Sequence, residues 1–348
     1  MSESDYSLYE LVAGKLDKSE IVELLKQNAD LVSKVSALET TIKEQADQIY
    51  MLNKQIDDSA QVTVPLKETD DNNYELETLR RIIAQIADAD KIKLSNQKVD
   101  AANKLQGKGD YDGAIKLCDE AIALNPNYAM AYNNRGWAYH CLNQHERAIQ
   151  DYDKAIQLNS DYIEAYNNRG RAYYCLEQYH RAIEDYDKAI QLNPRDDYAY
   201  SNRGWAYYCL NQYGRAIQDY DEAIKINPHY AFAYNNRGAA YFESKQYENA
   251  IADYDKALEL NPNDDYAYNN RGRAYSNLGQ YERAVQDYDK AIALNPNYNA
   301  AYNNRGAAYF ELKQYENAIA DYDKALELNP NDDYAYNNRE HCYRVLGK

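Results

Sequence analysis

Cysteine and histidine are the residue types in this chain that most readily bind metals or form disulfides. The 348 residues include five of each. Cys141, Cys175 and Cys209 are spaced 34 residues apart, so each belongs to a different unit of a repeat. The histidines are scattered and form no Cys-x-x-Cys or His-Glu-x-x-His motif. We therefore predict no metal site, no disulfide and no cofactor.

Catalytic motifs are also lacking. The sequence contains no glycine-rich phosphate loop and no serine nucleophile elbow. We predict that the protein is not an enzyme.

Asparagine is the residue type whose pattern suggests binding chemistry. The hexapeptide AYNNRG occurs five times, and two variants, AYSNRG and AYNNRE, begin at Ala199 and Ala335 in the same 34-residue frame. A carboxamide both donates and accepts hydrogen bonds, so it can pair with a peptide group whatever side chain that group carries. A row of such residues is suited to holding an extended protein segment.

The 34-residue period predicts pairs of helices that position these asparagines. In the unit 163–196, Tyr166, Gly170 and Tyr173 fall on one helical face, and Ala182 begins the same spacing on a second helix. Pro194 then ends the unit. The glycine lets the two helices approach closely, and stacking of neighbouring units buries their apolar faces. With 39 tyrosines against three phenylalanines, we expect buried rings whose hydroxyls stay satisfied at wet edges.

These residues resemble the tetratricopeptide repeat (TPR) family. The spacing Tyr-x-x-Arg-Gly-x-x-Tyr, followed by Ala-x-x-x-Tyr and then Pro, covers about 95–348. The resemblance implies an all-α fold, a right-handed α-solenoid of helix pairs whose first helices line the concave face. The family usually has apolar residues where this chain has Tyr166, Arg169 and Tyr186. A fold shared by many functions does not by itself specify one.

Seven full units are expected over 95–334, followed by a capping helix at 335–348. The first unit is degenerate, because Ala101 and Ala102 replace Arg-Gly. In the last helix Glu340 replaces the packing glycine and is expected to be solvated. The unit starts lie near Ser95, Ala129, Ile163, Asp197, Ala231, Asp265 and Asn299.

The resemblance also implies a peptide-binding groove. Family members that bind extended peptides contact the ligand backbone with an asparagine near the start of each first helix. By residue match this ladder is Asn134, Asn168, Asn202, Asn236, Asn270, Asn304 and Asn338. One turn further along, side chains that vary between units are expected to give selectivity, unless they merely fill gaps between helices. The predicted members of this stripe are Trp137, Arg171, Tyr174, Trp205, Tyr208, Phe242, Arg273 and Phe310.

Some TPR co-chaperones grip acidic chaperone tails with a clamp of Lys, Asn and Arg. Here Asn103 and Asn134 match, Lys98 is one residue out of place, and Glu164 stands where the family has Lys. Because Glu164 would repel a carboxylate, we predict no binding of such tails, which a calorimetric titration tests.

The arginine after each Asn-Asn replaces a usually apolar residue. We predict that Arg169 pairs with Asp185 or Asp187 of the Asp-Tyr-Asp on a second helix. The alternative is that it reaches the groove.

The first hundred residues follow another period. After a tail or short helix at 1–16, heptads over 17–57 predict a coiled coil, and Asn28 at an a position favours a parallel dimer. Trimers, or a helix folded back on the repeats, stay open. A linker at 58–73 and a connecting helix or second coiled segment at 74–94 follow. The predicted oligomerisation residues are Ile21, Leu24, Asn28, Leu31, Val35, Leu38, Ile42, Ile49 and Leu52.

Charge and hydropathy narrow the partners. A net charge of −17 disfavours nucleic acid and anionic membranes, both of which need a basic face. The sequence has no membrane-spanning apolar run and no signal-peptide pattern. We expect a cytoplasmic scaffold or adaptor, a homodimer that binds an extended neutral or basic protein segment. End-to-end self-assembly through the repeats and a regulatory subunit of an enzyme complex are the alternatives.

Overall fold

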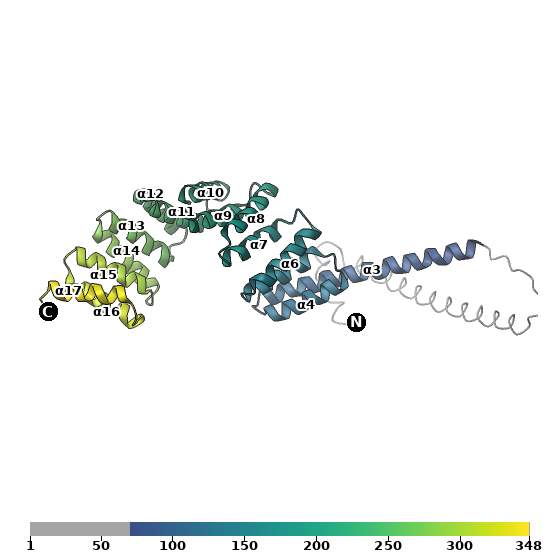
Figure 1. Ribbon diagram of the computed structural model, residues 1–348, viewed down its shortest axis with the longest axis horizontal. Helices are drawn as coiled ribbons and strands as arrows, with labels where there is room; N and C mark the ends of the chain where they lie inside the picture. The colour runs from purple at the N-terminus through teal and green to yellow at the C-terminus, as the bar shows by residue number, and fades with distance from the viewer. Residues whose placement is uncertain (1–69, 348) are drawn as a thin grey trace, which may run out of the picture. The chain divides into compact units, whose positions relative to one another are not determined.

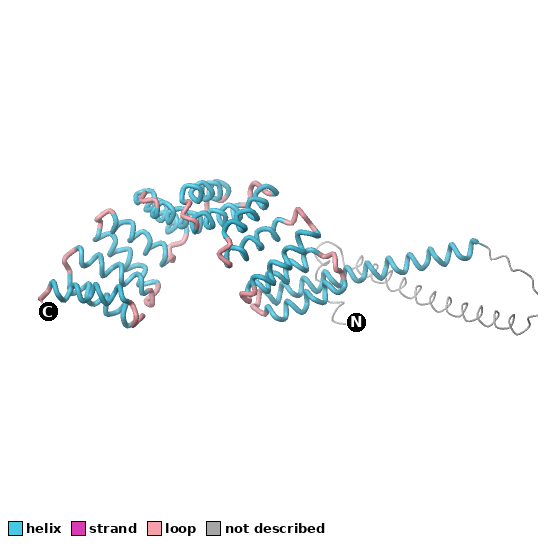
Figure 2. Tube along the Cα trace, viewed as in Figure 1, coloured by secondary structure: helices cyan, strands magenta, loops and turns pink. Residues whose placement is uncertain are grey.

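The structure, a computed structural model, describes residues 70–347. Over this range it contains fifteen α-helices and no strand, joined by short loops (Figures 1 and 2). The chain divides into two units, 1–81 and 82–348, and the repeats lie in the second. The predicted coiled coil at 17–57 lies outside the described residues.

The helices of the repeats alternate between two kinds. The first helices have 13 residues each and carry the Asn-Asn-Arg motif or its variant: α5 (Ala129–Cys141), α7 (Ile163–Cys175), α9 (Asp197–Cys209), α11 (Ala231–Glu243), α13 (Asp265–Asn277), α15 (Asn299–Glu311) and α17 (Asp333–Val345). The second helices have 14 residues each: α4 (Tyr111–Leu124), α6 (His145–Leu158), α8 (Tyr179–Leu192), α10 (Tyr213–Ile226), α12 (Tyr247–Leu260), α14 (Tyr281–Leu294) and α16 (Tyr315–Leu328).

The helix before α4 differs from the prediction. Helix α3 runs without a break over Asp70–Gln106, whereas the sequence predicted a linker to 73, a helix at 74–94 and a new helix near Ser95. No Pro or Gly lies between 70 and 106 to interrupt the backbone hydrogen bonds. The last part of this long helix therefore serves as the first helix of the first repeat.

Sequence signals end each helix of the repeats. Asn193 caps the end of α8, its side chain accepts a hydrogen bond from the Arg195 backbone (3.1 Å), and Pro194 prevents continuation. The turn between paired helices places one residue in the left-handed region, as at Glu177 (φ 58°) and Gly279 (φ 71°). The turn within a pair reverses the direction of the chain, and the turn after the second helix leads into the next pair.

A glycine and a tyrosine hold each pair together. The buried ring of Tyr186 on α8 packs on Gly170 of α7, where an added Cβ would lie 2.8 Å from the ring. The same contact recurs in the next four units and in the preceding one. The hydroxyls of Tyr152 and Tyr220 are buried without a partner among the described residues. The expectation that such hydroxyls reach a wet edge is wrong for these two.

Neighbouring pairs stack in order along the chain. From α6 to α16, each second helix packs against the first helix of its own unit and the first helix of the next, and α4 packs against α5. First helices of successive units also touch each other, as α7 and α9 do, so these helices form a continuous face. This consecutive packing of helix pairs confirms the all-α solenoid.

Candidate ligand-binding groove

Two neighbouring hollows open on the face formed by the first helices. Hollow 1, with a volume of about 440 Å³, is lined by Arg171, Tyr174, Cys175, Tyr186, Tyr198, Asn202, Trp205, Tyr230 and Phe232. Hollow 2, of about 230 Å³, is lined by Trp205, Tyr208, Asn235, Asn236, Ala239, Phe242, Glu243, Tyr254, Tyr266, Asn270 and Arg273. Trp205 borders both, so the hollows are adjacent.

The hollows gather many of the side chains that the sequence predicted for the groove. Hollow 1 has Arg171, Tyr174, Asn202 and Trp205 on its wall, and hollow 2 adds Tyr208, Asn236, Phe242, Asn270 and Arg273. Six of the predicted residues line neither hollow: Trp137, Phe310, Asn134, Asn168, Asn304 and Asn338. The candidate groove is therefore centred on α7, α9, α11 and α13.

Aromatic and cationic contacts order the variable stripe. Trp205 stacks on Tyr208, with ring centroids 4.9 Å apart, and its indole N–H donates to the Tyr174 hydroxyl. The Arg171 guanidinium lies over the Trp137 ring at 5.2 Å, and that of Arg273 over the Phe242 ring. Since these side chains support one another, little rotamer freedom is left to lose on binding.

The electrostatics of the two hollows differ. Arg171 is the only charged residue lining hollow 1, whereas hollow 2 has both Arg273 and Glu243. Burial raises the pKa of Tyr208 to about 12, and the phenol stays neutral at physiological pH. Hollow 1 is thus suited to a group without positive charge.

The Asn ladder is not uniform. The Asn168 carboxamide donates to Asn133 of the preceding unit (3.0 Å), and Asn304 donates to Asn269 in the same way (2.9 Å). Asn338 donates to the Tyr334 carbonyl of its own helix.

Two members of the ladder stand apart. The Nδ2 atoms of Asn202 and Asn236 are buried without a partner among the described residues. These two asparagines also line the hollows. The equivalents of the acceptors Asn133 and Asn269 in these two places, Asn167 Oδ1 and Ser201 Oγ, are also buried without a partner among the described residues.

The first asparagine of the motif lies between units, a role that the sequence left unassigned. Asn167 donates to Asp196 (2.8 Å), and Asp196 in turn accepts the Ala199 backbone N–H and caps α9. Asn303 makes the same bond to Asp332, which caps α17. The acidic cap three residues before the next motif was the signal in the sequence.

The arginine of the motif forms a ladder of ion pairs along the units. Arg169 binds Asp185 through two hydrogen bonds (2.9 and 2.6 Å), which confirms the predicted partner. A third bond reaches Asp153 on the second helix of the preceding unit. Asp187, the other predicted partner, instead binds Arg203 of the next unit. From Arg135 to Arg305, each arginine of the motif thus joins two second helices and is unavailable to the groove, whereas Arg339 pairs with Asp323 alone.

The ionisation of these pairs follows from their surroundings. Burial raises the pKa of Asp185, and the hydrogen bonds from Arg169 oppose that shift. Burial also penalises the Arg169 cation, but its bonds to Asp185 and Asp153 outweigh this and raise its pKa. The guanidinium keeps its charge, and the bidentate geometry favours an ionised pair.

The residues that resemble a chaperone-tail clamp are occupied in the structure. Asn134 donates to Asn103 (2.6 Å), and Lys98 forms an ion pair with Glu120. These contacts support the prediction that acidic tails do not bind here, which stays a prediction.

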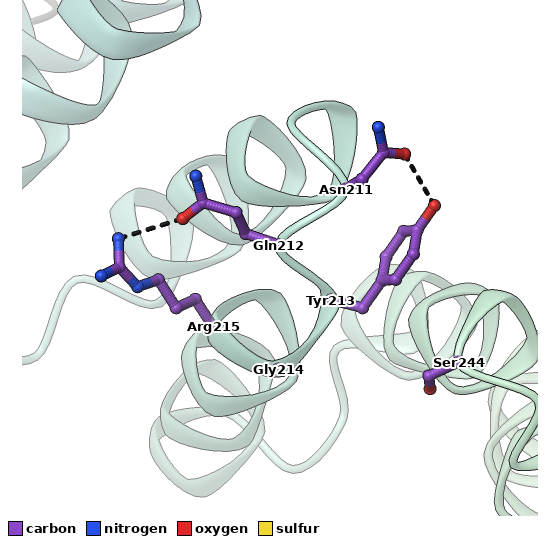
Figure 3. A pocket seen from close by; sticks show the side chains of 6 residues that line it. All are labelled: Asn211, Gln212, Tyr213, Gly214, Arg215 and Ser244. Atoms are coloured by element: carbon purple, nitrogen blue, oxygen red, sulfur yellow. Dashed lines mark hydrogen bonds between the residues drawn. The ribbon is translucent and has the colours of Figure 1, made fainter.

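A larger hollow of about 680 Å³ lies away from this face, at the turn between α9 and α10 (Figure 3). Arg215 donates to Gln212 (3.0 Å), and the Tyr213 hydroxyl donates to Asn211 (2.7 Å). Asn211, Gly214 and Arg215 are exposed. This hollow has no buried polar group without a partner, and we assign it no function.

Comparison with known proteins identifies the family. The tetratricopeptide repeat model matches residues 129–162, 163–196, 198–230, 231–264, 266–298 and 300–332, and a second TPR repeat model matches 102–143. These matches cover more than half of the chain. The protein belongs to the tetratricopeptide repeat family, whose members generally mediate protein–protein interactions.

Solved structures share the fold at low sequence identity. The APC/C hetero-tetramer Cut9–Hcn1 matches with a TM-score of 0.59 and 18% identity over 69% of this chain, which spans 48% of that one. A tetratricopeptide repeat protein from Parabacteroides merdae matches with a TM-score of 0.56 and 21% identity over 72% of this chain and 99% of that one. The pilF protein of Pseudomonas aeruginosa matches with a TM-score of 0.55 and 19% identity, over 61% and 97% of the two chains. These likenesses show the fold alone.

Two searches gave negative findings. No curated protein matched the chain. Among the described residues, no helix combines the length and the apolar character needed to cross a bilayer.

Proposed function

We propose that the protein is a non-enzymatic scaffold that binds an extended protein segment along its first helices. One observation carries the proposal. Asn202 and Asn236, the two ladder asparagines with buried unpaired amide donors, line adjacent hollows that share Trp205. A buried donor without a partner costs free energy, about 1–3 kcal/mol, which a ligand carbonyl recovers.

The chemistry of the segment follows from the hollows. The amides of Asn202 and Asn236 hold the backbone, so they set no side-chain preference. The stacked Trp205 and Tyr208 favour an apolar or aromatic side chain. Arg171 excludes a positive charge from hollow 1, whereas the net charge of −17 attracts basic flanking residues and does not repel neutral ones.

The proposed assembly is a cytoplasmic homodimer. The heptads over 17–57 lie outside the described residues, and their pattern supports pairing of two chains. Two grooves on one dimer bind a multivalent partner with avidity, because the second contact becomes intramolecular.

A peptide-library selection on the immobilised full chain tests the groove. We expect selected peptides to bind Asn202→Ala/Asn236→Ala at least about tenfold more weakly, in keeping with the loss of hydrogen bonds. Asn338→Ala is the matched control, since Asn338 bonds within its own helix. Peptides that bind the double variant as tightly as the wild type would overturn the proposal.

A second candidate is end-to-end assembly of copies through α17. Tyr336 is 53% exposed, whereas its equivalent one unit earlier, Tyr302, is 9% exposed, with further helices packed beyond its own. Tyr334 and Val345 are exposed on the same helix. A second copy seated there would bury these side chains. Concentration-dependent scattering that persists after deletion of 1–69 and is abolished by Tyr336→Lys would support this candidate.

A further inference from the structure

Two histidines of one unit lie close to a cysteine of the next unit. His140 lies near the end of α5, His145 begins α6, and Cys175 ends α7. One ligand atom from each residue lies within 4.8 Å of the other two. The sequence shows no motif that links these residues, because only the fold brings Cys175 beside the turn of the preceding unit.

The two imidazoles contact each other, and His140 also stacks on Trp137, but one nitrogen of each ring has no hydrogen-bond partner. The Nδ1 atoms of both His140 and His145 are buried and have no hydrogen-bond partner among the described residues. His140 is only 8% exposed, so its unpaired nitrogen cannot turn to solvent. Structural histidines usually satisfy their ring nitrogens, whereas these two each keep an unpaired nitrogen and lie in a cluster with a thiol.

The same triangle in the next unit provides a comparison within the chain. There Tyr174, Tyr179 and Cys209 occupy the equivalent positions, and the Tyr174 hydroxyl lies 3.5 Å from the Cys209 sulfur. The scaffold therefore accepts two aromatic phenols at these places without distortion. Only the earlier unit replaces both by imidazole, and two neutral imidazoles with a thiolate form a donor set typical of zinc.

We propose that His140, His145 and Cys175 bind one Zn²⁺ ion, which links the turn between α5 and α6 to the end of α7. Zinc bonds of about 2.0–2.3 Å place tetrahedral ligand atoms about 3.3–3.6 Å apart. Cys175 is exposed and His145 half-buried, so rotation of these two side chains closes the remaining gap. Water completes the coordination.

The charge balance of the site is defined by its neighbours. Binding releases the thiol proton of Cys175 to solvent, and the resulting thiolate offsets one of the two charges of the ion. Burial raises the pKa of the Cys175 thiol, and Arg171, whose guanidinium lies over Trp137, opposes that shift while also repelling the ion. Burial, helped by Arg171 and His145, lowers the pKa of His140 to about 4, and the imidazole is neutral, the form that binds metal.

Calorimetric titration of the full chain with Zn²⁺, under a thiol-free reductant, tests the site. We expect one ion per chain, and Co²⁺ in its place should give thiolate-to-metal absorption. Cys175→Ser and the double variant His140→Tyr/His145→Tyr should each weaken binding by at least about 10–100-fold, the loss caused by removing even outer-shell partners. The double variant copies the next unit and so is expected to fold.

Two controls make the outcome decisive. Cys209→Ser alters the equivalent thiol of the tyrosine triangle and should leave the zinc affinity unchanged. His145→Gln repeats the test at a half-buried position if the double variant fails to fold, as judged by circular dichroism. No binding by the wild type, equal binding by the Cys175 and histidine variants, or equal weakening by Cys209→Ser would each overturn the proposal.

Discussion

At the scale of single residues, the two carboxylates that bind each arginine are not equivalent. Arg203 makes two hydrogen bonds to Asp219, whose side chain is 8% exposed, and one to Asp187, whose side chain is 53% exposed. Removing one partner of a buried pair leaves an uncompensated charge, while an exposed pair is replaced by water at little cost.

We therefore predict unequal effects of neutralising the two. Asp219→Asn should lower the free energy of unfolding by about 3–5 kcal/mol. Asp187→Asn should lower it by less than about 1 kcal/mol. Urea unfolding followed by circular dichroism measures both, and equal losses would contradict the assignment of Asp219 as the principal partner.

A second residue-scale prediction concerns the glycine that packs on tyrosine. A Cβ at Gly238 would lie 2.8 Å from the Tyr254 ring, which is 1% exposed and has no room to move away. Gly238→Ala should destabilise by about 1–3 kcal/mol through overpacking. Gly214→Ala is the control, because nothing lies within 4 Å of its added Cβ, and the gain in helix propensity is up to about 1 kcal/mol. Thermal melting of the two variants should shift in opposite directions.

Side-chain pairing was predictable where it stays within a unit. The bond from Arg169 to Asp185 follows from the facing helices of one pair. The bond from Arg203 to Asp187 and the meeting of His140 with Cys175 join neighbouring units, and the bond from Asn167 reaches Asp196, which caps the first helix of the next unit. Their geometry depends on how far one unit is rotated against the next, which spacing within a unit does not reveal.

At the scale of elements, an asparagine follows each second helix as its C-cap, and the proline that the sequence analysis used as an end signal follows the asparagine in most units. Helix α3 is the exception, since the repeat period suggested a start near Ser95 where no local signal interrupts the helix. The 34-residue frame marks where a unit begins in the pattern but not where a helix begins physically. A boundary needs a cap, a proline or a glycine as well.

The left-handed residue in the turn within each pair has a conformational cost that can be tested by mutation. Glu177 adopts φ 58°, a left-handed conformation in which its Cβ is crowded, while Gly279 adopts φ 71° at the equivalent place without that cost. Glu177→Gly should stabilise the protein by about 0.5–1 kcal/mol, and Gly279→Ala should destabilise it by a similar amount. Chemical denaturation compares them. A loss of stability on Glu177→Gly would show that its side chain makes a contact worth more than the strain.

At the scale of the whole molecule, the repeated contacts between helices and the side chains that vary between units have different roles. The ion-pair ladder and the glycine–tyrosine contacts recur from unit to unit, so stability is close to a sum over units and their interfaces. The residues that differ between units and to which we assign selectivity, Trp205, Tyr208 and Phe242, lie around the two hollows. The sequence predicted this division because the repeats are so alike, but which asparagines have unpaired donors depends on hydrogen bonds between units.

The last prediction concerns how many chains act together. Full-length protein should scatter light as a dimer, since β-branched residues and leucines over 17–57 favour two strands and Asn28 at an a position disfavours larger assemblies. Deletion of 1–69 should give a monomer that keeps the helix content of the repeats, because 82–348 forms a compact unit of its own. Asn28→Ile should raise the thermal stability of the assembly and allow it to form with more than one number of chains. A full-length monomer at high concentration would remove the avidity from the proposed function. A dimer that survives the deletion would place the oligomer contact outside 1–69.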